Sequence, residues 1–301
     1  MNIKLIMMTV TAGVTLSFAP SIHTERTHGH EFAPQNNLRR PISQNLSGIT
    51  EEEFNAVLDK VYEIYKPIFK EHKAEFVIQR FWDDDTVNAY AFREGKKWNI
   101  AMYGGLARHE EVTRDGFMLV ACHEIGHHLG GYPRGGWASN EGNSDYYGTL
   151  KCLRRMWNNG DSIEIVKKMK VDKKAVELCE EQWEGNEERA ICERASMAGK
   201  SLGRLLAVLG GQEMPEFDTP DSTVVTKTNH AHPAAQCRLD TYFHGALCTV
   251  DWNQDMDEED PNVGACKVSE VGGRRACWFK EPSADENQPP GNEDEGEKIR
   301  W

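Results

Sequence analysis

Beyond its amino terminus, the sequence lacks any hydrophobic run of the roughly 20 residues that a membrane-spanning helix requires. We therefore expect no integral membrane segment in the mature chain. It also lacks a cluster of basic residues and carries a formal net charge of −13, so nucleic acid is not an expected partner. No Cys-x-x-Cys pair is present, which argues against a structural zinc ribbon. No internal repeat, the mark of solenoids and propellers, is evident.

The strongest apolar run lies at the amino terminus. Leu5–Phe18 follows a single lysine and is too short to span a bilayer, and Ser17–Ala19 offers small residues for cleavage. These features are typical of a signal peptide, which we place at residues 1–19. A buried amino-terminal helix is the alternative. Residues 20–47 are rich in Pro, Asn, Gln, Ser, His and Arg without an apolar period, and we expect a flexible leader there.

The cysteines agree with export from the cytoplasm. There are eight, an even number, which an oxidising compartment would pair. A secreted or periplasmic location follows, with eight buried reduced thiols as the alternative. Spacing alone does not settle the pairing. Short loops favour Cys179–Cys192, Cys237–Cys248 and Cys266–Cys277, which leaves Cys122 to pair with Cys152.

Hydrophobic periodicity predicts an α+β fold that is mainly α-helical. Thr50 and Glu53 form a capping box before an apolar helical pattern that reaches Ile68. Three short strand-like runs then predict a small antiparallel sheet beside the next helix. One domain over residues 48–280 is expected, with 246–280 as a disulfide-rich extension and 281–301 as a disordered acidic tail. The expected strands are 76–82, 87–92 and 98–103, and the later helices are 113–129, 139–157, 161–180 and 186–209, followed by a loop over 212–229.

The central motif is His123-Glu124-Ile125-Gly126-His127, within the helix expected at 113–129. Residues four apart lie on one face of a helix, so His123 and His127 are able to bind one Zn²⁺ from a single turn. The carboxylate of Glu124 then faces a metal-bound water and serves as its general base. His128 points to another face, and we expect it to be structural or exposed to solvent.

Catalytic zinc needs a third protein ligand and an open fourth position. Glu141 lies fourteen residues after His127, at the start of the next expected helix, and is our candidate. Asp145 shares its face of that helix and is placed to orient a ligand imidazole. The metzincin pattern is absent, because no third histidine occupies its position after His127.

Taken together, segment 88–145 resembles the gluzincin metallopeptidases of the HtpX and CAAX-prenyl-protease type. Asn88–Ala91, the strand 98–103 with its Gly-Gly-Leu turn, the zinc helix and the Glu-x-x-x-Asp of 141–145 are all similar to that family. The resemblance extends to His232-Pro233 and Arg238. It implies that His232 stabilises the oxyanion or gates the open zinc position, and that Arg238 anchors the loop or binds a carboxylate. The membrane helices of many members are absent from this sequence.

These residues predict a zinc metalloendopeptidase that cleaves polypeptides with one catalytic ion. A zinc-containing chaperone or binding protein of secreted-protein quality control is the alternative, and a disulfide-stapled structural domain without metal is another. In the enzyme, an extended substrate would add to an exposed strand by β-augmentation. We expect that strand to consist of Trp98, Asn99, Ile100, Ala101, Met102 and Tyr103.

Overall fold

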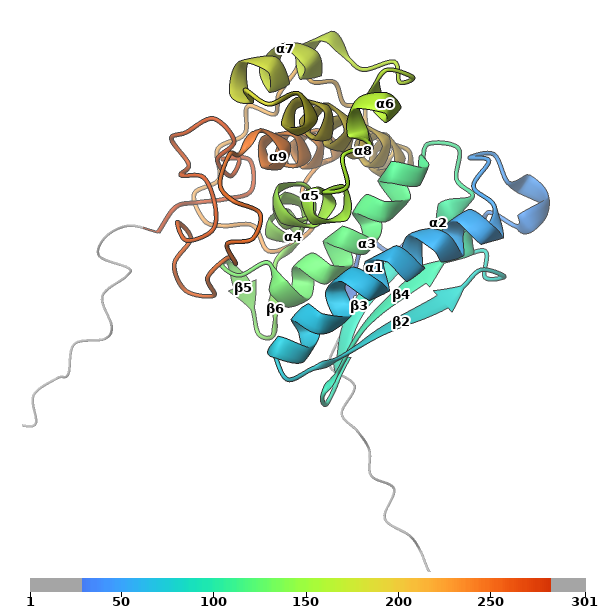
Figure 1. Ribbon diagram of the computed structural model, residues 1–301. Coiled ribbons are helices and arrows are strands. Elements are labelled where there is room, and N and C mark those ends of the chain that lie inside the picture. Colours follow the sequence, from blue (N-terminus) through green and yellow to red (C-terminus); the bar gives the residue numbers. More distant parts are fainter. Residues whose placement is uncertain (1–28, 283–301) are drawn as a thin grey trace, which may run out of the picture.

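The computed structural model describes residues 29–282 and combines a small sheet with helices packed on one of its faces (Figure 1). The signal peptide expected at 1–19 lies outside the described residues, as do residues 283–301 of the expected tail. The first half of the chain forms β1 (His30–Glu31), a 3-10 helix (Ile42–Gln44), α1 (Glu51–Glu71), β2 (Glu75–Phe81), β3 (Ala89–Glu94), β4 (Lys97–Tyr103), α2 (Gly104–Ala107) and α3 (Arg114–Leu129). The second half forms β5 (Arg134–Gly135), β6 (Ala138–Ser139), α4 (Glu141–Tyr147), a π-helical turn (Gly148–Cys152), α5 (Leu153–Met156), α6 (Ser162–Val166), α7 (Lys173–Gln182), α8 (Asn186–Gly210) and α9 (Ala235–Leu247).

The α+β class is as predicted, but the main sheet is mixed rather than antiparallel. Its strand order is β1-β3-β4-β2, and β2 pairs parallel to β4 while β3 pairs antiparallel to it. After β2, the chain skips one strand position and forms β3 antiparallel to β2. The skipped position is later filled by β4. The tight hairpin at Gly95 then sends β4 back between its two predecessors, parallel to the first. Strand patterns in the sequence carry no information on this crossover.

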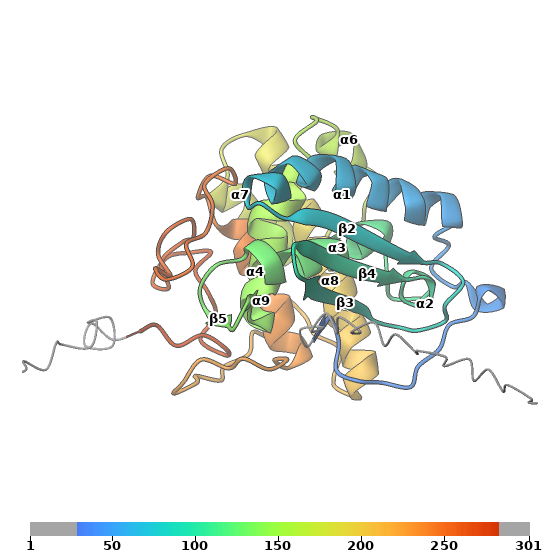
Figure 2. The same ribbon diagram turned by 90° about the horizontal axis from the view of Figure 1, so that it is seen from below.

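The sheet has one face buried against helices. Ala91 and Ile100 are partners in the β3–β4 register and are fully buried, whereas Tyr90 and Tyr103 emerge on the opposite face, where their rings are in contact. This alternation is the period of two expected when a strand has one buried face. Helices α1 and α3 cover the buried face (Figure 2).

Helix α3 runs through the centre of the molecule and is buried almost all round. Thr113 caps its start by accepting a hydrogen bond from the backbone N–H of Gly116. The sheet and α1 contact it on one side, and α4 and α8 on the other. A central helix of this kind shows little amphipathic periodicity, because nearly every direction faces protein. Its histidines are therefore interior groups.

Two expected helices are each divided, and one helix was not expected. The helix predicted at 161–180 forms two separate helices, α6 and α7. The helix predicted at 139–157 is divided into α4, a π-helical turn and α5. A π turn adds one residue to a helical turn, so the buried side of α5 is rotated relative to that of α4. A search for apolar residues at a spacing of 3.6 does not detect this change. Helix α9 was not predicted at all, although Leu239, Tyr242 and Phe243 are buried at helical spacing.

All eight cysteines are paired, and two of the four expected pairs are correct. Cys122–Cys152 and Cys179–Cys192 form as predicted. The remaining pairs are Cys237–Cys277 and Cys248–Cys266, so the expected Cys237–Cys248 and Cys266–Cys277 were wrong. Helix α9 separates residues 237 and 248 by about 16 Å at 1.5 Å per residue, far beyond disulfide reach. The unpredicted helix is thus the reason for the error.

The described part of the leader, residues 29–47, is not the flexible chain that we expected. Its first residues form β1 against β3, with His30 opposite Ala91 and Glu31 opposite Tyr90. Phe32 and Ala33 are each 0% exposed. The composition of this segment suggested a flexible chain. However, a few buried apolar residues are enough to order an extended segment when the edge of a sheet satisfies its backbone N–H and C=O groups.

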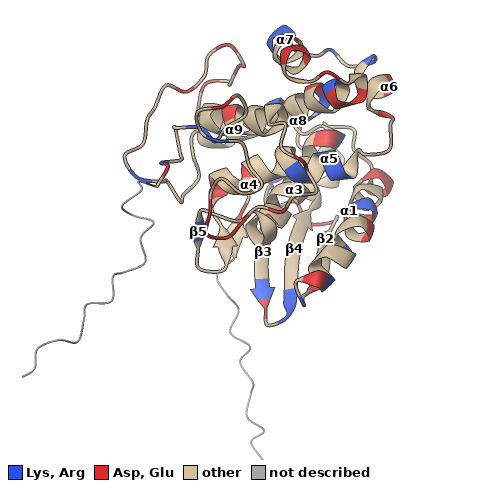
Figure 3. Ribbon diagram, turned by 60° about the vertical axis from the view of Figure 1, so that its left-hand side comes forward, with Lys and Arg blue, Asp and Glu red and all other residues tan. Residues whose placement is uncertain are grey.

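The exposed helices carry interspersed acidic and basic residues (Figure 3). On α7, for example, Lys174 forms an exposed pair with Glu177. In residues 29–282, no helix combines the length and apolarity needed to cross a lipid bilayer. Both observations agree with the share of charged residues in the whole chain, 28%.

Candidate metal centre and active site

Helix α3 presents His123 and His127 to one point in the interior. The Nδ1 atom of His123 donates to Oδ1 of Asp145 at 2.7 Å, and Nδ1 of His127 donates to the carbonyl of Ser139 at 2.9 Å. A hydrogen bond at Nδ1 fixes the tautomer and leaves the Nε2 lone pair available to a metal ion. Both imidazoles are therefore set up as ligands.

Helix α4 brings Glu141 to the same point. Its Oε2 lies 3.3 Å from Nε2 of His123, and its Oε1 lies 3.6 Å from Nε2 of His127. The two helices approach closely because residue 126 of the motif is glycine. A Cβ atom on Gly126 would lie 2.8 Å from Cα of Ser144, so any side chain would push α4 and its carboxylate away.

The atoms that converge here are buried without ordinary partners. Within residues 29–282, His123 Nε2, His127 Nε2 and Glu141 Oε2 have no hydrogen-bond partner. Buried polar atoms in native proteins are nearly always satisfied, so three such atoms in one place indicate a missing partner. Ligand atoms around a tetrahedral ion with bonds of about 2.0–2.1 Å lie roughly 3.3 Å apart, which matches the observed separations. The donor set fits a metal ion.

Charge in the site also favours a bound cation. Burial lowers the pKa of His123, but Asp145 and Glu141 outweigh it and raise that pKa to about 9. Burial would raise the pKa of Glu141, yet the neighbouring imidazoles, first of all His127, hold it well below its usual range. Burial lowers the pKa of His127 to about 3. Glu141 is thus a carboxylate and His127 a neutral imidazole, the forms in which these groups bind metals, whereas His123 would release a proton when a metal binds.

Glu124 provides a further buried carboxyl group. It is 0% exposed, and both of its oxygens lack a hydrogen-bond partner within the described chain. Burial raises its pKa well above the usual value, and the charge of His123 opposes this shift. A carboxylate in this setting has a high affinity for a proton, which suits a general base.

His128, next to the motif, has a structural role. Its Nε2 donates to the carbonyl of Asn99 at 3.1 Å, and its ring stacks between those of Trp98 and Trp137. Burial lowers its pKa well below the usual value. It therefore joins α3 to β4 and does not face the metal ligands.

Arg238 and His232 both reach the site from the segment around the start of α9. Arg238 forms two bonds of 2.7 Å to the carboxylate of Asp145, from Nε to Oδ2 and from Nη2 to Oδ1. Nε2 of His232 lies 3.4 Å from Oε2 of Glu141 and donates to the carbonyl of Glu31 at 2.7 Å. The structure thus gathers all the residues that the sequence placed here, except the substrate strand.

That strand is not where we expected a substrate to bind. Residues 98–103 belong to β4, which pairs with β2 over residues 97–103 and with β3 over residues 97–102. An interior strand has no free N–H and C=O groups for another chain. The expectation of an exposed strand at 98–103 was wrong: the outer strands of the sheet are β2 on one side of β4 and β1 beyond β3 on the other.

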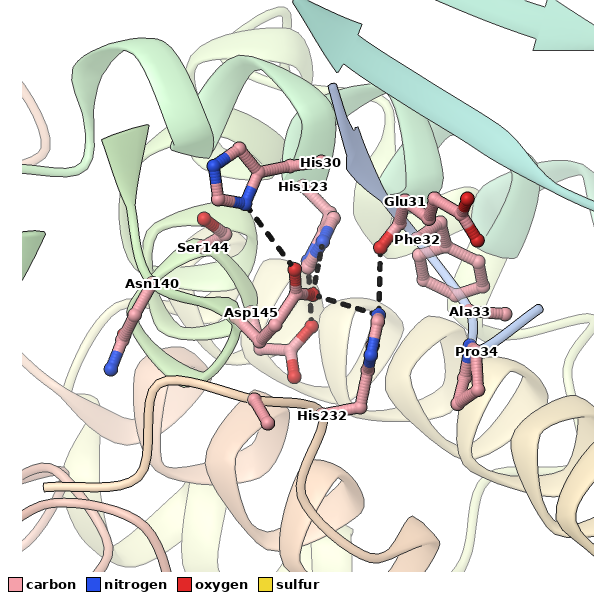
Figure 4. Close-up of polar contacts among 12 residues, drawn as sticks. His30, Glu31, Phe32, Ala33, Pro34, His123, Asn140, Ser144, Asp145 and His232 are labelled. Carbon is pink, nitrogen blue, oxygen red and sulfur yellow. Dashed lines mark hydrogen bonds and ion pairs between the residues drawn. The ribbon is translucent and has the colours of Figure 1, made fainter. Parts of the chain in front are cut away.

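One residue of the site was missed in the sequence. Nδ1 of His30 lies 3.9 Å from Oε1 of Glu141, and the centroid of its ring lies 4.8 Å from that of His127. Figure 4 shows His30 at the site that also contains His123, Asp145 and His232. His30, His127 and Glu141 form a group whose ligand atoms all lie within 4.8 Å of one another and could hold a metal ion. No motif links His30 to the distant zinc helix, and only the number of histidines in the leader hinted at it.

The carboxy-terminal extension supports the helix that carries Glu141. A Cβ atom on Gly142 would lie 2.3 Å from the ring of Trp278, so this indole packs directly on α4. Arg274 donates from Nε to the side-chain oxygen of Asn143 at 2.8 Å. The Cys237–Cys277 disulfide holds this layer against α9. We find that the extension buttresses the site from outside.

Comparison with known proteins does not assign the chain: no protein-family model, curated protein or solved structure matches it. The geometry of the site is therefore the basis for a functional proposal.

Proposed function

We propose that this protein is a zinc-dependent endopeptidase. The observation that carries the proposal is the convergence of His123, His127 and Glu141, whose ligand atoms are buried, close together and without hydrogen-bond partners in the described chain. Two imidazoles and one carboxylate are the protein ligands of a well-known class of catalytic zinc sites. The resemblance to gluzincin metallopeptidases points the same way.

Zinc suits this donor set better than other common ions. Calcium and magnesium prefer six or more oxygen ligands, whereas this site offers two nitrogens. Imidazole nitrogen with one carboxylate is typical of zinc, although iron and other transition metals share these ligands. The four disulfides agree with an oxidising location. Zinc suits such a location because, unlike iron, it has no redox chemistry that would damage the chain.

The residues around the ion supply the rest of the chemistry. When bound, zinc acts as a Lewis acid and lowers the pKa of a coordinated water. In this proposal the carboxylate of Glu124 would accept a proton from water and would deliver it to the leaving amine. His232 donates a hydrogen bond from the side of Glu141 opposite His30, where a substrate carbonyl oxygen would gain negative charge. Asp145 and Arg238 hold His123 in its orientation.

The test is a metal analysis combined with a digestion. We expect purified protein to contain about one zinc per chain by elemental analysis and to cleave casein or a peptide library. A chelator should abolish cleavage, and added Zn²⁺ should restore it. A protein without bound metal, or cleavage that is indifferent to chelation, would contradict the proposal.

A zinc-containing binding protein with little proteolysis is a second candidate, favoured by one observation. His30 approaches the ligand group as a further protein donor, and structural zinc sites are closed by four protein ligands. Bound zinc without cleavage of any peptide, even after His30 is replaced, would favour this function.

A further inference from the structure

The N-terminal segment, residues 29–36, lies across the candidate active site as an extended chain. It pairs antiparallel with β3, and the N–H of Phe32 donates to the carbonyl of Ala89 at 3.0 Å. The side chain of Asn88 accepts from the N–H of Ala33 and donates to its carbonyl, at 3.0 and 3.1 Å. Strand addition of this kind is how many proteases and binding domains hold a peptide.

We propose that this segment is a built-in inhibitor of the endopeptidase, in which His30 is the fourth metal ligand and Glu31 presents its carbonyl in place of a substrate carbonyl. The inference rests on the proposed function and concerns how that function is controlled. Residues 29–31 close the site, so the intact chain cleaves slowly until they are removed or displaced.

His30 has the position of a ligand. Its Nδ1 lies near Oε1 of Glu141, the same oxygen that approaches His127, while His123 and His232 approach the other oxygen. This imidazole, the third nitrogen and the fourth ligand, would complete a tetrahedral set and leave no vertex for water. The rings of Trp137 and His30 pack edge to face, with centroids 5.3 Å apart, and this contact limits the movement of His30 away from the site.

Glu31 occupies the position of a reacting group. Its backbone carbonyl accepts a hydrogen bond of 2.7 Å from His232, the residue that we assign to the substrate carbonyl (Figure 4). While this bond exists, Nε2 of His232 has its proton directed at the segment. A substrate therefore competes with Glu31 for the same donor.

Phe32 anchors the segment. Its side chain is 0% exposed, its ring packs edge-on against that of His123 at 5.3 Å, and its carbonyl accepts from Nη1 of Arg238 at 2.7 Å. An inhibitor tethered in this way acts at a high effective concentration, so it blocks the site without tight binding of His30 itself. The anchor also means that the segment need not leave as a whole, since displacement of residues 29–31 is enough to uncover the ligands.

The experiment compares full-length, zinc-loaded proteins. The variants are His30→Ala and, as a milder replacement, His30→Gln. The matched control is His72→Ala, at an exposed histidine that ends α1. One readout is X-ray absorption at the zinc edge, which counts coordinated imidazoles. The other is the cleavage rate of a quenched fluorescent peptide library, with the double variant H30A/E124Q as the blank.

We expect three imidazoles in the wild type and in H72A, two in both His30 variants, and cleavage at least about tenfold faster in the His30 variants. The blank should remain inactive. Equal imidazole counts in wild type and His30 variants would overturn the ligand assignment while leaving the endopeptidase intact. A lost imidazole without faster cleavage would overturn the inhibition. Failure of the proposed function looks different, because no protein in the set would then bind zinc, or the blank would cleave as fast as H30A.

Discussion

Asp145 accepts a hydrogen bond of 2.7 Å from Nδ1 of His123, and the same carboxylate is held by two bonds from Arg238. Burial alone would raise the pKa of Asp145, but the charge of Arg238 outweighs it and keeps the pKa below its usual value. The carboxylate is therefore charged and fixed. It connects α9 to the imidazole that faces the metal position.

This connection predicts that Asp145→Asn weakens metal binding without removing a ligand. Loss of such a partner typically lowers metal affinity about 10–100-fold. Competition with a coloured chelator measures the affinity. The control is Asp115→Asn, which also breaks a carboxylate–arginine pair on a helix, with Arg194, but far from the ligands. Equal affinities in the two variants would show that Asp145 does not act on the metal.

Removal of a ligand should have a larger effect than removal of its neighbour. We expect His123→Ala to lose the metal, because the variant keeps only one of the two imidazoles that the zinc helix supplies. His128→Ala changes a buried histidine on the same helix, which faces Asn99 and the tryptophans. It should cost stability and keep its metal. Elemental analysis after dialysis distinguishes them, and full zinc content in His123→Ala would refute the ligand assignment.

Glu124→Gln should separate metal binding from catalysis. The amide has nearly the shape of the carboxylate but does not take up the proton of the attacking water, so cleavage should fall by about 10²–10⁴-fold or more. Zinc content should stay near that of the wild type, since Glu124 is not among the converging ligand atoms. Glu164→Gln, on the surface of α6, is the matched control. Retained cleavage would argue against Glu124 as the base.

His244 should make the fold sensitive to acid. Burial and the charge of Arg275 lower its pKa to about 4, and its Nδ1 donates to the carbonyl of Gly273 at 3.0 Å. In the unfolded chain its pKa is about 6.5. As pH falls from 6.5 to 4, His244 binds a proton in the unfolded state but not in the folded state. The free energy of unfolding therefore decreases, by about 3 kcal/mol at most.

His244→Gln keeps a donor for Gly273 but does not titrate. Urea unfolding at pH 7 and pH 4.5 should therefore show a smaller loss of stability on acidification for the variant than for the wild type. Parallel losses in both proteins would exclude His244 as the responsible group.

The structure predicts which cysteines are covalently linked. Peptide mapping without reduction should recover Cys237 linked to Cys277 and Cys248 linked to Cys266. Replacing both Cys237 and Cys277 by serine should lower stability by about 2–4 kcal/mol and loosen Trp278 on α4. The same double replacement at Cys179 and Cys192 removes a bond far from Glu141 and is the control for metal affinity. Recovery of a 237–248 peptide would contradict the fold of α9.

Much of this molecule follows from local patterns. The capping box at Thr50, the helix that begins after Thr113 and the pair Cys179–Cys192 are local features, and the structure has them. Cys122–Cys152 was predicted only as the pair that the short loops left over. The grouping of His123, His127, Glu141 and Asp145 also followed from spacing. Residues four apart share one side of a helix, and one short loop joins the two helices.

Contacts between distant segments were decided only by the tertiary structure. Whether β4 lies inside the sheet depends on the path of the chain between strands, which leaves no mark on strand composition. The π turn after α4 and the pairing of Cys237 with Cys277 depend on packing between helices. The approach of His30 to Glu141 joins residues 111 positions apart, since 141 − 30 = 111. The sequence itself thus determined which side chains of the two helices are candidates for binding a metal, because helical geometry is local. Only the tertiary structure decided that β1 lies over these side chains. The reason is that paired strands are separated by no fixed number of residues along the chain.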